Sequence, residues 1–332
     1  MNRSAHIPSV FTRFPQLLAL RDRLAGLIRT RRATAPVPTR LGLEAMEERL
    51  VPDGRPLPFP VIFAGSGESH AAVVKAYDAD TGNLRWSKTV FGDGFEGGVR
   101  VAAGDITGDG IPDAIVAPGA GLAPQVKVLD GTTGGVLDGP LGSFLAFGTE
   151  NNGGVFVASG DVNGDGRQDV IATTLTDFGP RVKAFSGVDG SVLSDFAVPG
   201  AAFAGGITLA AADFSGDGKA EVAVGGSGGR VRVYDPLTGT LAGGGLGERF
   251  LTPFGTGYDG PVFAASDELA GDVDGDGVPD LVIGTDGSIT RVRVFSGATG
   301  AGLYDFEPFG PGATGGARVA LAYADDDDRA DI

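Results

Sequence analysis

The chain has 332 residues and a net charge of −16, and 58 of those residues are glycine, more than twice the usual share of about 7%. It has no cysteine and only two histidines, which excludes disulfide frameworks, thiol nucleophiles and cysteine-ligated zinc. An acidic chain also repels nucleic acid, so we expect no nucleic-acid partner. Hydrophobic residues make up 42%, and so many glycines favour tight turns between short apolar strands in an all-β protein.

Residues 1–58 differ in composition from the rest of the chain. The first 40 residues hold eight arginines and one acid, with Leu17, Leu20 and Leu24 at the spacing of a short amphipathic helix. Charges interrupt its apolar stretch too early for a conventional signal peptide, and no segment approaches the roughly 18 apolar residues of a membrane span. We expect residues 1–58 to be a basic leader and linker, largely disordered or processed, and residues 59–332 to form the folded domain.

Residues 41–52, with the sequence LGLEAMEERLVP, resemble a short element found near the N-termini of many large bacterial surface proteins. The resemblance implies export by an atypical leader and a location outside the cell or at its surface. A solvated connecting helix is the alternative interpretation.

An internal repeat dominates the rest of the chain. A loop of the form Asp-x-x-Gly-Asp-Gly occurs within residues 104–116, 160–172, 212–224 and 271–283. The first aspartates of successive copies lie 56, 52 and 59 residues apart. Each copy is followed by an apolar run, an alternating segment such as Val126-Lys127-Val128, and a turn that ends in glycine, which is a β-hairpin signal. A third segment, which usually ends in Phe-Gly, and a strand that begins with Gly-Gly complete the unit.

Four short strands in such a unit cannot bury their faces alone, and radial repetition solves this problem as a β-propeller. The period is too long for the rungs of a parallel β-helix. The sequence therefore predicts about five blades, each a four-stranded antiparallel sheet, with negligible helix.

The two ends of the repeat region have complementary gaps. Residues 315–332 match the segment that begins at Gly97, and they stop where the next apolar strand should begin. The segment 60–65 is that type of strand without a loop before it. This predicts a ring closed by the strand at 60–65 lying beside the one at 318–322; a truncated array is the alternative.

The Asp loops carry the chemistry. Each strong copy has oxygen-bearing side chains at positions 1, 3, 5 and 9, a glycine at position 6 for the sharp bend, and a freely varying side chain at position 7. Ca²⁺ takes six to eight oxygen ligands, and clustered carboxylates without a cation repel one another. We therefore expect about four Ca²⁺ sites. The candidate ligands are Asp105, Thr107, Asp109, Asp113, Asp161, Asn163, Asp165, Asp169, Asp213, Ser215, Asp217, Glu221, Asp272, Asp274, Asp276 and Asp280.

These loops run into β-type apolar segments and lack the position-12 glutamate of helix–loop–helix calcium sites. With the Phe-Gly and Gly-Gly features, residues 59–332 resemble the FG-GAP/VCBS repeat of integrin α-chain propellers and of many bacterial surface proteins. The resemblance implies one Ca²⁺ per loop between the first two strands of a blade. The third loop has a softer ligand set, and a fifth has Tyr323 at position 1 and Asp328 in place of glycine, which puts binding near Asp325 in doubt.

Two functions fit this pattern. The first is a calcium-stabilised, non-enzymatic module that binds a protein or glycan at the cell surface, as in adhesion. The second is an accessory or catalytic propeller acting on polysaccharide, as a lyase or hydrolase. Because the acids that stand out serve metal loops and His70 stands alone, we expect no enzyme activity. Cations two residues apart at Arg181 and Lys183, at Arg230 and Arg232, and at Arg291 and Arg293 predict either an anionic-glycan surface or a solvated strand face whose charges counter nearby acids.

Overall fold

The computed structural model describes residues 61–79, 81–174, 180–200, 203, 207–247, 251–268, 271–287, 289–321 and 329–332. All of these lie in one compact unit, Glu48–Ile332. The expectations for residues 1–58, and for Tyr323, Asp325 and Asp328 of the fifth loop, concern residues outside those described.

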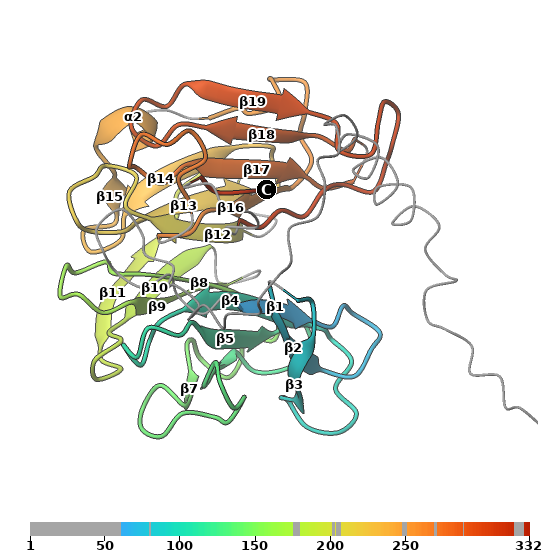
Figure 1. Cartoon of the computed structure of the whole chain (residues 1–332), viewed down its shortest axis with the longest axis vertical. Coiled ribbons are helices and arrows are strands. Elements are labelled where there is room, and N and C mark those ends of the chain that lie inside the picture. Colours follow the sequence, from blue (N-terminus) through green and yellow to red (C-terminus); the bar gives the residue numbers. More distant parts are fainter. Residues whose placement is uncertain are drawn as a thin grey trace, which may run out of the picture. The chain divides into compact units, whose positions relative to one another are not determined.

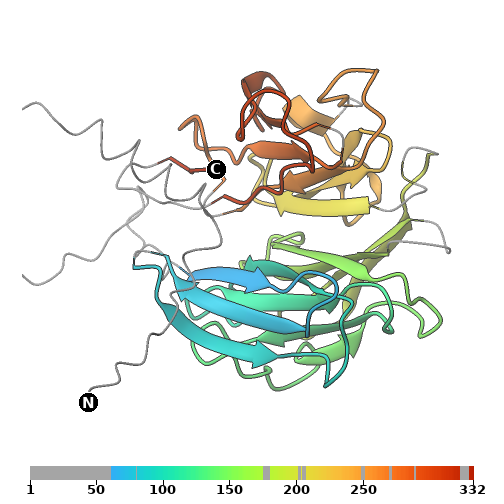
Figure 2. The ribbon, with the colours of Figure 1, turned by 90° about the vertical axis from the view of Figure 1, so that its right-hand side faces the viewer.

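The strands form five antiparallel sheets in chain order (Figure 1). The first sheet has three strands that lie side by side (Figure 2): β1 (Val61–Gly65), β2 (Val73–Asp78) and β3 (Leu84–Thr89). The second and third sheets consist of β4 (Val99–Gly104), β5 (Asp113–Pro118), β6 (Gln125–Leu129) and β7 (Ser143–Leu145), and of β8 (Val155–Gly160), β9 (Asp169–Thr174), β10 (Arg181–Phe185) and β11 (Val192–Ala197). The fourth and fifth consist of β12 (Ile207–Ala212), β13 (Glu221–Gly226), β14 (Val231–Asp235) and β15 (Thr240–Leu241), and of β16 (Val262–Ala265), β17 (Leu281–Thr285), β18 (Val292–Phe295) and β19 (Gly302–Phe306).

This architecture is a five-bladed β-propeller and confirms the predicted all-β fold. Among the described residues there is one α-helix, α2 (Gly244–Gly247), and it has four residues. The strand that follows each Gly-Gly pair is the first strand of a four-stranded blade. An Asp loop therefore joins the first and second strands of each of these blades.

Burial decreases from the middle of each sheet toward its last strand. Every residue of β5, β9, β13 and β17 is buried, which explains their largely apolar sequences after the acid that begins three of them. The third strands alternate as predicted, while last strands such as β15 and β19 are largely exposed. Short, exposed last strands limit edge-to-edge association with other chains.

Neighbouring sheets pack through shared apolar clusters. Ile115 and Val126 of the second sheet, for example, share a core cluster with Val155 and Val170 of the third. Trp86 is 8% exposed, and its indole N–H donates a 2.9 Å hydrogen bond to the Gly131 carbonyl oxygen of the next sheet. This tryptophan therefore serves packing between sheets.

The segment that follows the last sheet contacts that sheet in the same way as the second sheet contacts the first. The Val99 amide donates to the Ser66 carbonyl at 2.9 Å beside the first sheet, and the Ala317 amide donates to the Thr285 carbonyl at 2.7 Å beside the last. Ala317 thus follows the last sheet as Val99 follows the first. Within the described residues, β1 pairs with β2 alone and residues 317–321 form no strand, so the closing pair of strands at 60–65 and 318–322 stays a prediction.

Candidate metal centre

The four complete Asp loops connect β4 to β5, β8 to β9, β12 to β13 and β16 to β17. Their glycines at positions 4 and 6 have positive φ angles, for example 72° at Gly108 and 84° at Gly110 in the first loop, and 82° at Gly275 and 86° at Gly277 in the fourth. Side chains at these positions would strain the backbone, so both glycines are needed for the curled conformation.

The aspartate at position 1 organises the loop. The Asp161 carboxylate accepts hydrogen bonds from the amides of Gly164 at 2.7 Å, Asp165 at 3.1 Å and Gly166 at 2.7 Å. The same three positions donate to Asp105 and to Asp272. In this respect each first aspartate acts like a cap that satisfies otherwise unpaired backbone donors.

The acid at position 9 ties the loop to the hairpin of the third and fourth strands. Asp280 is fully buried, accepts from the Val273 amide at 2.8 Å and the Gly297 amide at 3.1 Å, and burial raises its pKa to about 6. Asp113 and Asp169 make the equivalent bonds to Gly131 and Gly187, and burial likewise raises the pKa of each to about 6. One side chain therefore links three strands.

The third loop departs from this arrangement for a physical reason. Pro236 stands where the other hairpins have the donating glycine, and proline has no N–H. The position-9 acid there is Glu221, which accepts from the Ser215 amide at 3.0 Å. Burial raises its pKa to about 7, above that of its counterparts.

Three carboxylates converge in two of the loops. Ligand oxygens of Asp272, Asp274 and Asp276 all lie within 4.8 Å of one another, and so do those of Asp213, Asp217 and Glu221. No third acid comes this close in the described loops at Asp105 and Asp161. Because every donor is oxygen, both clusters fit a hard cation such as Ca²⁺.

The remaining predicted ligands take part in local hydrogen bonds. Asp109 accepts from the Ile111 amide at 2.8 Å, and the Asn163 side-chain amide donates to Asp165 at 2.9 Å. Thr107 and Ser215 lie at position 3 of their loops, and the backbone amide of each donates to the position-9 acid.

Position 7 has a role that sequence reasoning missed. Its side chain was expected to vary freely, yet the Arg167 guanidinium donates a 2.8 Å hydrogen bond to the Ile106 carbonyl of the preceding loop. Arg167 also lies beside Gly108 of that preceding loop, and Lys219 lies beside Gly164 and Arg329 beside Gly275 in the same way. The available signal was that position 7, beside acidic neighbours, is a cation in the loops that begin at Asp161, Asp213 and Tyr323.

The paired cations on the third strands mostly meet acids. Arg181 and Lys183 contact Asp195, and Arg291 and Arg293 contact Asp305. Of the two interpretations of these cations, the structure supports partners for nearby acids.

The comparisons with known proteins agree with this geometry. The family model of the FG-GAP-like repeat matches residues 161–224, from the first residue of the second Asp loop into β13. Together with the five antiparallel sheets, this match fits an FG-GAP-like repeat β-propeller.

Three similar solved structures are the computationally designed Ika8 protein and Sqt1 of Chaetomium thermophilum, bound to the N-terminus of ribosomal protein L10 and alone. For Ika8 the identity is 19%, with 80% of this chain and 63% of that chain covered and a TM-score of 0.38. For Sqt1 the identities are 16% and 17%, with 76% of this chain covered, 60% and 59% of those chains covered, and a TM-score of 0.47 in both.

This chain thus spans about three fifths of the length of these structures. The search of curated proteins gave no match. Within the described residues, no helix has the length and apolar character that crossing a membrane requires.

Proposed function

We propose that this chain is a calcium-stabilised extracellular β-propeller that serves as a non-enzymatic binding or adhesion module for a protein or glycan. The observation that carries the calcium assignment is the convergence of Asp272, Asp274 and Asp276 within 4.8 Å. Ionised carboxylates at this separation repel one another, and a divalent cation between them turns repulsion into attraction.

In this proposal calcium is a structural staple. Each loop joins the first two strands of a blade, and in three loops its buried position-9 acid reaches a glycine amide of the hairpin beyond. Any ion that binds only the folded state adds stability by mass action. A site at 100 times its dissociation constant contributes about 2.7 kcal/mol, a large part of a typical domain's net 5–15 kcal/mol.

The test is thermal unfolding with calcium and with chelator. Asp276→Ala should lower the melting temperature in calcium but change it little in chelator, where the bare acids repel one another. Asp138→Ala, an exposed acid outside the loops, is the matched control and should behave like the unmutated chain in both conditions. Equal melting temperatures of the unmutated chain in calcium and in chelator would refute the metal assignment.

The non-enzymatic part of the proposal is supported by the roles of the loop acids and by the position of His70. They accept hydrogen bonds from backbone amides and offer oxygen ligands, and within the described part of the chain the side chain of the exposed His70 contacts the Glu68 carbonyl oxygen at 3.0 Å. Glycan and protein arrays probed with the calcium-loaded chain should give binding that chelator abolishes. Turnover of a polysaccharide by that chain would overturn the non-enzymatic assignment.

A further inference from the structure

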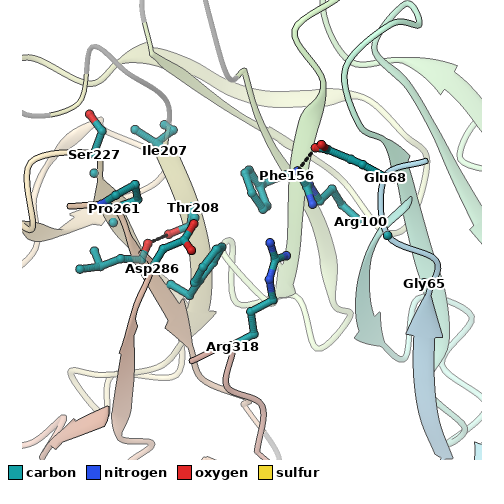
Figure 3. A pocket seen from close by; sticks show the side chains of 15 residues that line it. Gly65, Glu68, Arg100, Phe156, Ile207, Thr208, Ser227, Pro261, Asp286 and Arg318 are labelled. Atoms are coloured by element: carbon teal, nitrogen blue, oxygen red, sulfur yellow. Dashed lines mark hydrogen bonds and ion pairs between the residues drawn. The ribbon is translucent and has the colours of Figure 1, made fainter. Parts of the chain in front are cut away.

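Figure 3 shows a cavity of about 710 Å³. Because the starts of four first strands line it, and the Asp loops follow the ends of these strands, the cavity and the loops lie at opposite strand ends. The cavity is lined by the starts of β4, β8, β12 and β16, by the loops after β1, β13 and β17, and by Arg318. Its volume is in the range of small-molecule binding sites.

One position of the repeat supplies five of the side chains that line the cavity. The second residue of each first strand faces the cavity, and Arg318 holds the same place in the segment Gly315-Gly-Ala-Arg, which parallels Gly97-Gly-Val-Arg. In chain order these residues are Arg100, Phe156, Thr208, Phe263 and Arg318.

Both arginines lie against aromatic rings, and of the two only Arg100 has an acid within ion-pair distance among the described residues. The Arg100 guanidinium lies 4.6 Å from the centroid of Phe156, and that of Arg318 lies 4.5 Å from the centroid of Phe263. Both guanidinium groups extend into the cavity (Figure 3). Glu68, 69% exposed in its side chain, approaches Arg100 only to 3.7 Å, and the described residues form no salt bridge with Arg318.

This pair of like charges is unfavourable as it stands. Burial and, next, the charge of Arg318 lower the pKa of Arg100, and the charge of Glu68 offsets this only in part. The Arg100 Nε has no hydrogen-bond partner among the described residues. An anionic group between the two guanidinium groups would supply the counter-charge and accept paired hydrogen bonds.

Acceptors lie elsewhere in the cavity lining. The Thr208 hydroxyl donates to the Val262 carbonyl at 2.9 Å and keeps its lone pairs for another donor. Asp286 also lines the cavity, and none of the hydrogen bonds among the described residues goes to its carboxylate. These groups favour hydroxyl donors on the part of a ligand that is remote from its charge.

We propose that this cavity binds an acidic sugar residue, with its carboxylate between Arg100 and Arg318 and its hydroxyl groups toward Asp286 and Thr208. The proposal rests on the proposed binding function and names its ligand class and site. An acidic peptide matches less well, because it offers one backbone N–H donor per residue beside its acceptors, whereas a sugar ring offers several hydroxyl donors.

The experiment is a calorimetric titration of the full chain in saturating calcium with a glucuronate oligosaccharide and with its neutral glucose counterpart. The acidic ligand should bind and the neutral one should not. Arg100→Gln and Arg318→Gln should each weaken binding by about 10-fold or more, as loss of a charged hydrogen bond implies. Arg291→Gln, directly before β18 and paired with Asp305, is the matched control and should leave affinity unchanged.

Asp286→Asn tests the hydroxyl side of the cavity and should weaken the sugar but not inorganic phosphate. Phosphate binding as tightly as the uronate, or an acidic peptide binding more tightly, would overturn the sugar assignment. Affinity that survives Arg318→Gln would overturn the site. If calcium still raises the melting temperature but no sugar binds, this inference alone is refuted. If calcium does not change the melting temperature, the proposed calcium role is refuted.

Discussion

The buried position-9 acids show how one residue serves two purposes. Asp113, Asp169 and Asp280 satisfy backbone donors on both sides, yet burial costs their charged form more than these bonds return, so the pKa of each rises to about 6. Glu221, with one donor replaced by Pro236, has a pKa raised further, to about 7. A bound cation would favour the ionised form of these same groups.

These pKa shifts predict the pH dependence of the metal-free chain. Each folded-state pKa lies above the ordinary value of 3.8 or 4.5, so the stabilisation is complete below that value and is lost as pH rises through about 6 to about 7. In chelator, the melting temperature should therefore fall between about pH 4 and about pH 7, the range from the unfolded to the folded pKa values, and level off above it. Calcium requires ionised acids, so its added stabilisation should grow over the same range.

Thermal melts across this pH range, with and without chelator, check the prediction. Glu221→Gln removes the group with the highest of these pKa values and should flatten the slope above about pH 6. A metal-free melting temperature that rises toward pH 8 would contradict the sign of the effect.

At the scale of elements, the Asp loops form a connected series. The Ala220 amide donates to the Asp161 carbonyl at 2.8 Å, and the Ala330 amide donates to the Asp272 carbonyl at 2.7 Å. Position 8 of one loop thus meets position 1 of the loop before it, while Arg167 makes a similar link from position 7. Each loop is held by its own strands and by the next blade.

We predict that this link is worth more than an exposed ion pair. Arg167→Ala should lower the free energy of unfolding by about 1–2 kcal/mol, because it removes a charged donor from a partly buried carbonyl. Arg291→Ala removes an ion pair whose arginine side chain is 42% exposed and should cost less than about 1 kcal/mol. Urea unfolding in calcium measures both, and equal losses would show that the loops do not support one another.

At the scale of the whole molecule, close packing of successive blades fixes where the ends can go. A Cβ on Gly65 would lie 2.5 Å from the Val99 carbonyl oxygen, and one on Gly284 would lie 2.1 Å from that of Ala317. Because Phe263 pairs with Gly284 in the last sheet, the equivalent pairing at a closed ring puts Arg318 opposite Gly65.

This register predicts a specific cross-link. It places Leu321 opposite Ile62, and directly opposite residues bring their Cβ atoms to about 4.5–5.5 Å, close enough for a disulfide after a small adjustment. Since the chain has no cysteine of its own, Ile62→Cys with Leu321→Cys should form an intramolecular disulfide that raises the melting temperature. Ile62→Cys with Val192→Cys is the control, and failure of the first pair to cross-link would favour an open array.

Most of the fold could be predicted from the sequence because its signals are local. Alternation of Val126, Lys127 and Val128, glycine-ended turns and the regular recurrence of Asp105, Asp161, Asp213 and Asp272 each report on a few neighbouring residues. Repetition then multiplied those signals until only a propeller could bury the faces of every unit. The candidate ligand positions came from the same local spacing.

Contacts between repeats were decided only by the tertiary structure. Nothing local indicates that Arg167 reaches the preceding loop, or that the loops at Asp213 and Asp272 are the ones in which three acids converge. The meeting of Arg100 and Arg318 in one cavity depends on how the blades turn about a common centre. Periodicity states which face of a strand is buried, whereas the packing of whole sheets decides which distant side chains share that space.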